Sequence, residues 1–149
     1  MVRPLTDDEL SAWRAFLRAH AAVIDALNRE LENERGMSIA EFDVLATLSA
    51  AGGRLRMGEL ADAVLLSRSG VTRLVDRMVA AGLLRRERCP SDRRGSFAVL
   101  TAAGRQALRD AGPVHARGVA EHFARFLSPE DARRIAEVFE KVAPRGLGC

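Results

Sequence analysis

Hydrophobic residues recur at spacings of three and four along most of the chain, the pattern of helices with one apolar face. The first such segment begins at Thr6, which forms a capping box with Glu9, and it reaches about Asn33. Gly36 follows as a C-terminal cap. The apolar stripe of this helix consists of Leu10, Trp13, Phe16, Leu17, His20, Ala21, Ile24, Leu27 and Leu31.

Three shorter helices and one extended piece are predicted between residues 38 and 82. Ser38 and Glu41 form a second capping box in front of a helix that ends near Gly52–Gly53. The stretch "RLRM" is extended, and "GELADAVL" is a third helix that starts at Gly58 without a Ser or Thr cap. The fourth helix covers "RSGVTRLVDRMVAAG".

A β-hairpin then interrupts the helical pattern. The chain predicts a strand over 83–89, a turn over 90–95 and a second strand over 96–100, after which Thr101 caps a new helix. Gly112–Pro113 is expected to kink or interrupt that helix, because proline lacks an N–H and clashes one turn back. The fold class is therefore mostly α with a small β-hairpin, in the element order of a winged helix-turn-helix.

Charge is concentrated in one part of a globular composition. Hydrophobic residues make up 48% of the chain and charged residues 29%, and the formal net charge is only +3. Residues 67–94 nevertheless carry eight arginines against three carboxylates, whereas residues 1–66 carry seven basic and eleven acidic side chains. A basic segment of this kind is typical of a nucleic-acid surface, although charge alone also fits a solvated face.

Other functional classes have little support in the sequence. No apolar run reaches the ~20 residues of a membrane span and no signal-peptide stretch is present, so a cytoplasmic protein without a membrane partner is expected. Cys89 and Cys149 lie far apart, and the three histidines lack carboxylate partners at useful spacing. We therefore expect no enzyme, no catalytic residue, no metal and no cofactor. An interaction module for RNA or protein is the alternative to a DNA-binding protein.

The helix predicted at about 67–81 has two different faces. Its polar face carries small hydroxyl side chains near the N-terminus and arginines further on. This arrangement suits a recognition helix, because hydroxyls allow close approach to base edges and arginines reach guanine or phosphate. The apolar residues are Val71, Leu74, Val75, Met78 and Val79, and the polar ones are Arg68, Ser69, Thr72, Arg73, Asp76 and Arg77.

The stretch "ELADAVLLSRSGVTRLVDRMVAAGLLRRERCPSDRRGSFAVLTAAG" resembles the MarR (multiple antibiotic resistance regulator) family of transcription factors. Its most specific part is "SDRRGSFAVLTAAG", which is similar to that family's wing signature, an Asp-Arg-Arg turn that leads to Leu-Thr and a Gly. The part "SRSGVTRLVDRM" resembles the family's recognition helix. With the flanking helices, the resemblance covers nearly the whole chain.

The resemblance implies a repressor that binds double-stranded DNA at a palindromic operator. The wing, residues 85–100, would enter the minor groove with Arg94 and, less centrally, Arg93. Asp92 would position a neighbouring arginine, and Arg77 would hold a phosphate. The residues implied in the major groove are Ser67, Arg68, Ser69, Thr72 and Arg73.

The resemblance also implies a homodimer. The whole chain, residues 1–149, would form a single MarR-type domain, and the terminal helices are too apolar along their stripes for a lone winged helix. The expected dimerisation region consists of residues 6–34 and 101–143, and the expected DNA-binding lobe of residues 38–100.

Relief of repression by a small molecule is the last implied property. Trp13, Phe16 and His20 share one face of the first helix, and Asp43 and Arg73 could be the polar partners of a small phenolic or anionic effector. The alternative is that Trp13 and Phe16 belong to the dimer core. The first helix has no cysteine for oxidant sensing, and Cys89 is expected to be an exposed thiol on the wing strand.

Overall fold

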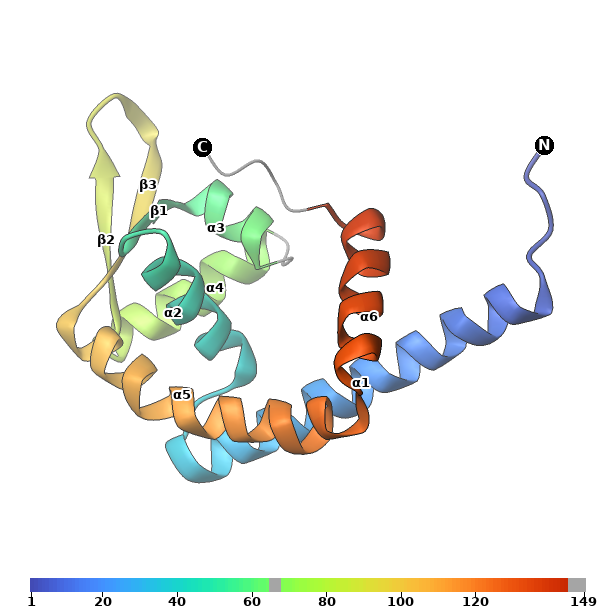
Figure 1. Ribbon diagram of the computed structural model, residues 1–149. Helices are drawn as coiled ribbons and strands as arrows, with labels where there is room; N and C mark the ends of the chain where they lie inside the picture. Colours follow the sequence, from blue (N-terminus) through green and yellow to red (C-terminus); the bar gives the residue numbers. More distant parts are fainter. Residues whose placement is uncertain (65–67, 145–149) are drawn as a thin grey trace. The chain divides into compact units, whose positions relative to one another are not determined.

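The computed structural model describes residues 1–64 and 68–144, and of Arg68, Arg93 and Arg94 it describes the backbone alone (Figure 1). The predicted fold class, mostly helical with a small antiparallel sheet, is confirmed. The elements are α1 (Asp7–Arg35), α2 (Ile39–Ala50), β1 (Arg54–Arg56), α3 (Met57–Ala63), α4 (Arg68–Ala80), β2 (Leu84–Cys89), β3 (Asp92–Leu100), α5 (Ala102–His122), a 3₁₀ turn η1 (Ala124–Phe126) and α6 (Pro129–Val142).

The chain forms two compact units, and the long helices α1 and α5 contribute to both. One unit consists of residues 1–26 and 116–149, and the other of residues 27–115. We call the first the helical unit and the second the winged unit. Each is described by itself below.

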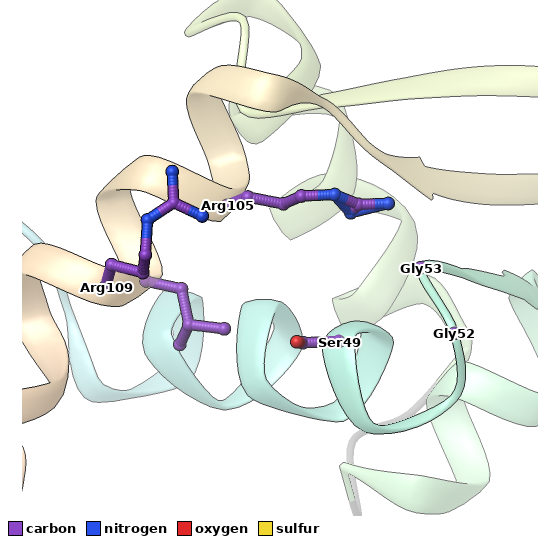
Figure 2. A pocket seen from close by; sticks show the side chains of 6 residues that line it. Ser49, Gly52, Gly53, Arg105 and Arg109 are labelled. Atoms are coloured by element: carbon purple, nitrogen blue, oxygen red, sulfur yellow. The ribbon is translucent and has the colours of Figure 1, made fainter.

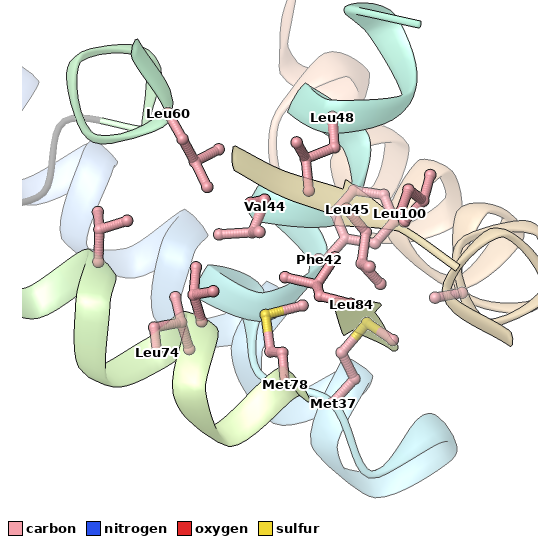
Figure 3. Packing of buried hydrophobic residues seen from close by; sticks show 14 of the residues in the cluster. Met37, Phe42, Val44, Leu45, Leu48, Leu60, Leu74, Met78, Leu84 and Leu100 are labelled. Atoms are coloured by element: carbon pink, nitrogen blue, oxygen red, sulfur yellow. The ribbon is translucent and has the colours of Figure 1, made fainter. Parts of the chain in front are cut away.

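The core of the winged unit lies between its helices and the sheet (Figure 3). Leu45, Leu60 and Val75, from α2, α3 and α4, are each fully buried. Burial of one such side chain contributes about 1.5–3 kcal/mol relative to leaving it in water. The apolar face of α4 therefore packs on α2 and α3, and this packing fixes which face of α4 points outward.

Three antiparallel strands form the sheet, in the order β1-β3-β2. The predicted turn over 90–95 was too long, because β3 begins at Asp92 and only Pro90 and Ser91 separate the strands. Cys89 pairs with Asp92 and Arg88 with Ser96, so residues 93–95 form a bulge. Backbone hydrogen bonds between β2 and β3 form on both sides of the extra residues. For this reason the strand continues where a turn was expected.

The start of α5 is held tightly against the end of α4. Thr101 Oγ1 donates to the carbonyl oxygens of Gly82 and Leu83, at 2.7 and 2.9 Å, and accepts from the Gly104 N–H at 3.0 Å. A Cβ on Gly104 would lie 2.1 Å from the Leu83 carbonyl oxygen. The Leu-Thr and Gly of the wing signature therefore have a structural role, since together they join the wing to α5.

Of the two predicted effects of Gly112–Pro113, an interruption does not occur, since α5 runs from Ala102 to His122 with Pro113 inside it. Besides its missing N–H and its clash one turn back, proline in a helix also meets the backbone N–H and Cβ of the preceding residue. Gly112 has no Cβ, which removes the contact with the preceding side chain.

The helical unit leaves much of its apolar surface exposed. Phe16 and Phe139 meet edge to face, with ring centroids 5.3 Å apart. Ser128 and Asp131 form a capping box at the start of α6, yet no residue of α6 is buried. The large exposed side chains of this unit include Trp13, Phe16, Leu17, Ile24, Phe123, Phe126, Val138, Phe139 and Val142.

Candidate nucleic-acid interface

Helix α4 presents a polar face to solvent because its other face is buried in the core. Val71, Leu74 and Val75 are at most 3% exposed, whereas Thr72 and Arg73 between them are exposed. The same alternation continues along the helix, where Met78 is buried and Arg77 is exposed. Hydroxyl and guanidinium groups therefore share one open helical face, as the sequence pattern predicted.

An ion pair joins this helix to the hairpin. Arg86 Nη2 of β2 lies 3.0 Å from Asp76 Oδ1 of α4, and both side chains are partly exposed. An exposed pair of this kind contributes about 0–1 kcal/mol, so its effect is on orientation more than on stability. It fixes the outer edge of α4 relative to the wing strand.

A second group of side chains covers the sheet face of the wing. The guanidinium of Arg54 lies over the Phe97 ring, 3.8 Å from its centroid, and that of Arg56 lies 5.5 Å away. Glu87 accepts from Arg85 at 2.9 Å and lies 3.5 Å from Arg54. These contacts link all three strands, because they involve side chains of β1, β2 and β3.

Cys89 is buried, at 6% exposure, which corrects the expectation of an exposed thiol. The bulge turns it inward, where its Sγ and Ser91 Oγ form a hydrogen bond at 3.2 Å. That hydrogen bond, with a smaller contribution from the Ser91 backbone, lowers the pKa of the Cys89 thiol. The wing turn is thus closed from inside by a cysteine–serine contact.

Comparison with known proteins connects this geometry to a family. A family model described as MarR family matches residues 35–95. The HTH-type transcriptional regulator MhqR of Bacillus subtilis is 30% identical over 138 residues, which are 93% of each protein. This chain belongs to the MarR family of DNA-binding transcriptional regulators. It is accordingly a winged helix-turn-helix regulator and not an enzyme.

Solved structures of the MarR family agree in fold over nearly the whole chain. AbsC from Streptomyces coelicolor is 38% identical, with a TM-score of 0.86, over 95% of this chain and 96% of that one. Sco3205 from the same organism, solved in complex with DNA, is 36% identical, with a TM-score of 0.89, over 96% of this chain and 90% of that one.

Several residues predicted to contact DNA can be placed on this MarR fold, and others cannot. Ser69, Thr72, Arg73 and Arg77 all lie exposed on α4. Ser67 lies outside the described residues. Only the backbone is described for Arg68, at the start of α4, and for Arg93 and Arg94, in the wing bulge.

Asp92 and Thr72 line the same hollow between the wing and the helix-turn-helix. This pocket has a volume of about 540 Å³ and is also bordered by Glu59 and Asp62 of α3. The recognition helix and the start of the wing strand β3 therefore open onto one depression. The sequence pattern did not indicate that Arg54 and Arg56 approach the wing, because only the pairing of β1 with β3 brings them there.

The residues predicted to bind an effector fall in different units of this MarR chain. Trp13, Phe16 and His20 form a row of rings in the helical unit, with neighbouring centroids 6.0 and 6.2 Å apart. Phe16 and His20 line a pocket of about 650 Å³ between α1, α5 and α6, and its wall is otherwise apolar. Asp43 belongs to the winged unit.

Asp43 has a histidine as its electrostatic neighbour. Burial raises the pKa of the Asp43 carboxyl and lowers that of His115, and each charge partly offsets the shift of the other. The His115 ring stacks on Phe42, with centroids 4.3 Å apart.

Across residues 1–64 and 68–144, no group of three His, Cys, Asp or Glu side chains could hold a metal ion. Over the same residues, no helix is long and apolar enough to cross a membrane.

Proposed function

We propose that this protein binds double-stranded DNA as a homodimer and represses transcription from a palindromic operator. The observation that carries the proposal is the divided surface of α4, which is buried along Val71, Leu74 and Val75 and exposed along Thr72 and Arg73. Sco3205, 36% identical to this chain, has been solved in complex with DNA, which supports the same use of this fold.

Within this proposal, α4 enters the major groove. Ser67, Arg68, Ser69, Thr72 and Arg73 read base edges, because the N-terminal part of a recognition helix lies deepest in the groove. Arg77, one turn further on, binds a phosphate. The Asp76–Arg86 ion pair holds the Arg86 guanidinium against α4 and directs the Asp76 carboxylate toward β2.

The wing, in turn, enters the minor groove. Arg93 and Arg94 supply the cations that a narrow, A·T-rich minor groove attracts. Asp92 is the positioning residue at the start of β3. The stacking of Arg54 on Phe97 stiffens the strand that carries this tip.

Dimerisation completes the proposed regulator through residues 6–34 and 101–143, with residues 38–100 as the DNA-binding lobe. A protomer alone would expose Phe126 at 67% and Val142 at 78%, together with the other apolar side chains of the helical unit. An uncovered apolar surface of this extent is typical of a protein–protein interface. A second copy is the simplest partner, since two-fold symmetry also matches a palindrome.

A small phenolic compound is the effector class we favour for relief of repression. In the pocket of the helical unit, His20 is the polar side chain among apolar walls, which suits an aromatic ring with one hydroxyl better than an anion. Trp13 extends the row of rings beside it. Asp43 is the remaining proposed ligand residue.

A mobility-shift experiment tests the central proposal. The purified protein is mixed at low salt with duplex DNA from the region upstream of its own gene, with RNA of the same length as competitor. We expect a duplex complex that RNA does not displace and that weakens steeply with salt. If the protein prefers RNA, or if Arg73→Ala leaves duplex binding unchanged, the basic face has another use.

A further inference from the structure

The winged unit contains a second basic site, on α5 instead of α4. A pocket of about 310 Å³ lies between α5 and the turn that follows α2 (Figure 2). Arg105 extends toward the Gly52–Gly53 turn, Arg109 lies on the α5 side, and Ser49 contributes a hydroxyl from α2. Leu108 supplies the apolar part of the wall.

The pocket carries positive charge without a carboxylate in its lining. Its charged side chains are Arg105 and Arg109, four residues apart on α5. Like charges at this spacing on one helical face repel each other. In the described part of the chain Arg105 forms no ion pair, and Arg109 donates to the neutral Gln106 Oε1 at 2.7 Å. In Figure 2 the Arg105 guanidinium extends toward the Gly53 turn and the Arg109 guanidinium points in another direction, so an anion in the pocket would meet positive charge on two sides.

Gly53 allows the guanidinium of Arg105 to lie directly against the turn. A Cβ built on Gly53 would meet Arg105 Nη2 at 2.7 Å. The last turn of α2 has no basic residue of its own, so Arg105 also lies where it can offset the negative end of that helix. Proximity to the end of α2 explains the position of Arg105, but it does not explain that of Arg109.

The position of the pocket separates it from the proposed DNA surface. The Leu100 N–H donates to the Gly53 carbonyl oxygen, so the pocket lies at the end of β3 that is opposite the wing turn. Asp92 pairs with Cys89 and Leu100 with Leu84, so the two ends of β3 are separated by five steps of β2, or roughly 17 Å. A DNA backbone held by α4 and the wing turn is therefore not the natural occupant.

We propose that this pocket binds a small oxyanion, a carboxylate or a phosphate monoester, through Arg105 and Arg109. Guanidinium groups bind both planar and tetrahedral oxyanions with paired N–H donors. The Ser49 hydroxyl is a further donor, and Leu108 contacts an apolar part of the ligand. The volume lies at the lower limit of ligand pockets, which restricts the occupant to a small molecule.

Two probes distinguish the sources of such an anion: inorganic phosphate and benzoate, each compared with chloride at equal ionic strength. Binding to the full-length protein is followed by amide and arginine Nε NMR shifts and by the melting temperature, without DNA. We expect one probe at least to shift Gly53 and Arg105 and to raise the melting temperature. If neither probe shifts the signals of Gly53 and Arg105, the proposal is wrong.

Variants assign the effect to the pocket. Arg105→Gln and Arg109→Gln should each weaken binding of the probe by about tenfold, because each removes a charged hydrogen-bond donor. Arg18→Gln makes the same change of charge on exposed α1 and should leave probe binding unchanged. Equal loss in all three variants, or no loss in the pocket variants, contradicts the assignment.

A DNA titration of the same variants tests the remaining alternative, that the pocket holds a DNA phosphate. If Arg105→Gln lowers operator affinity as strongly as Arg73→Gln does, the pocket holds a DNA phosphate and the small-anion proposal is wrong. Since the probe measurements contain no DNA, their failure and a failure of the DNA-binding proposal are separate results.

Discussion

Two arginines on one face of α4 should affect DNA binding in different ways. Arg73 lies in the first half of the helix Arg68–Ala80, and Arg77 lies in its last turn. Their separation of four positions corresponds to about 6 Å along the helix axis. Because base edges meet the N-terminal part of a recognition helix, we expect Arg73 to read a base and Arg77 to hold a phosphate.

The magnitudes follow from these two kinds of contact. Arg73→Gln should cost about 1–3 kcal/mol per half-site on operator DNA and much less on scrambled DNA, so that specificity falls. Arg77→Gln should weaken both DNAs about equally. It should also reduce the slope of log affinity against log salt by about 0.9 per contact, or roughly 2 for a homodimer.

Fluorescence anisotropy with operator and scrambled duplexes, between about 50 and 200 mM salt, measures both quantities. Arg18→Gln, an exposed arginine on α1, is the control for loss of charge. Arg77 also offsets the negative end of α4, so a thermal melt must show that the variant is folded. If Arg73→Gln and Arg77→Gln change operator and scrambled binding by the same ratio, the division of roles is refuted.

Three further outcomes are expected. Leu45→Ala, at a fully buried position, should lower the free energy of unfolding by about 2–5 kcal/mol in a urea titration. Phe139→Glu should shift the dimer toward monomer in light scattering, whereas Glu140→Gln on the same helix should not; an unchanged mass for the first variant would remove this face from the interface. Hydrogen bonds from Arg3 and from the Thr6 N–H lower the pKa of Glu9 to about 2. The stability this gives the start of α1 should be complete above about pH 4.5 and should be lost as the pH falls through about 2, visible in the protection factors of the first-turn amides; protection factors independent of pH over that range would contradict it.

Local chemistry could be predicted from the sequence because it depends on neighbouring residues. The capping boxes at Thr6–Glu9 and Ser38–Glu41 predicted two helix starts, and the structure shows the Thr6 and Ser38 oxygens accepting from the expected N–H groups. The apolar spacing on α4 likewise predicted which face is buried. In both cases the deciding interactions lie within one or two helical turns.

Contacts between distant segments escaped prediction for the opposite reason. Nothing in the spacing of "RLRM" shows that Arg54 will stack on Phe97, since this requires the pairing of β1 with β3. The inward turn of Cys89 depends on a bulge whose register is set by both strands.

These distant contacts also change how the charge of the basic segment should be counted. Residues 67–94 contain eight arginines, but Arg86 is paired with Asp76 and Arg85 with Glu87. At most six arginines of this segment therefore remain per protomer to neutralise DNA phosphates, and in a homodimer the segment should contribute a salt slope no steeper than about −11. Asp76→Asn releases Arg86 for DNA and should steepen the slope, whereas Asp110→Asn on α5 should not. If Asp76→Asn leaves the slope unchanged, the ion pair does not withhold Arg86 from the DNA and its role is confined to holding β2 against α4.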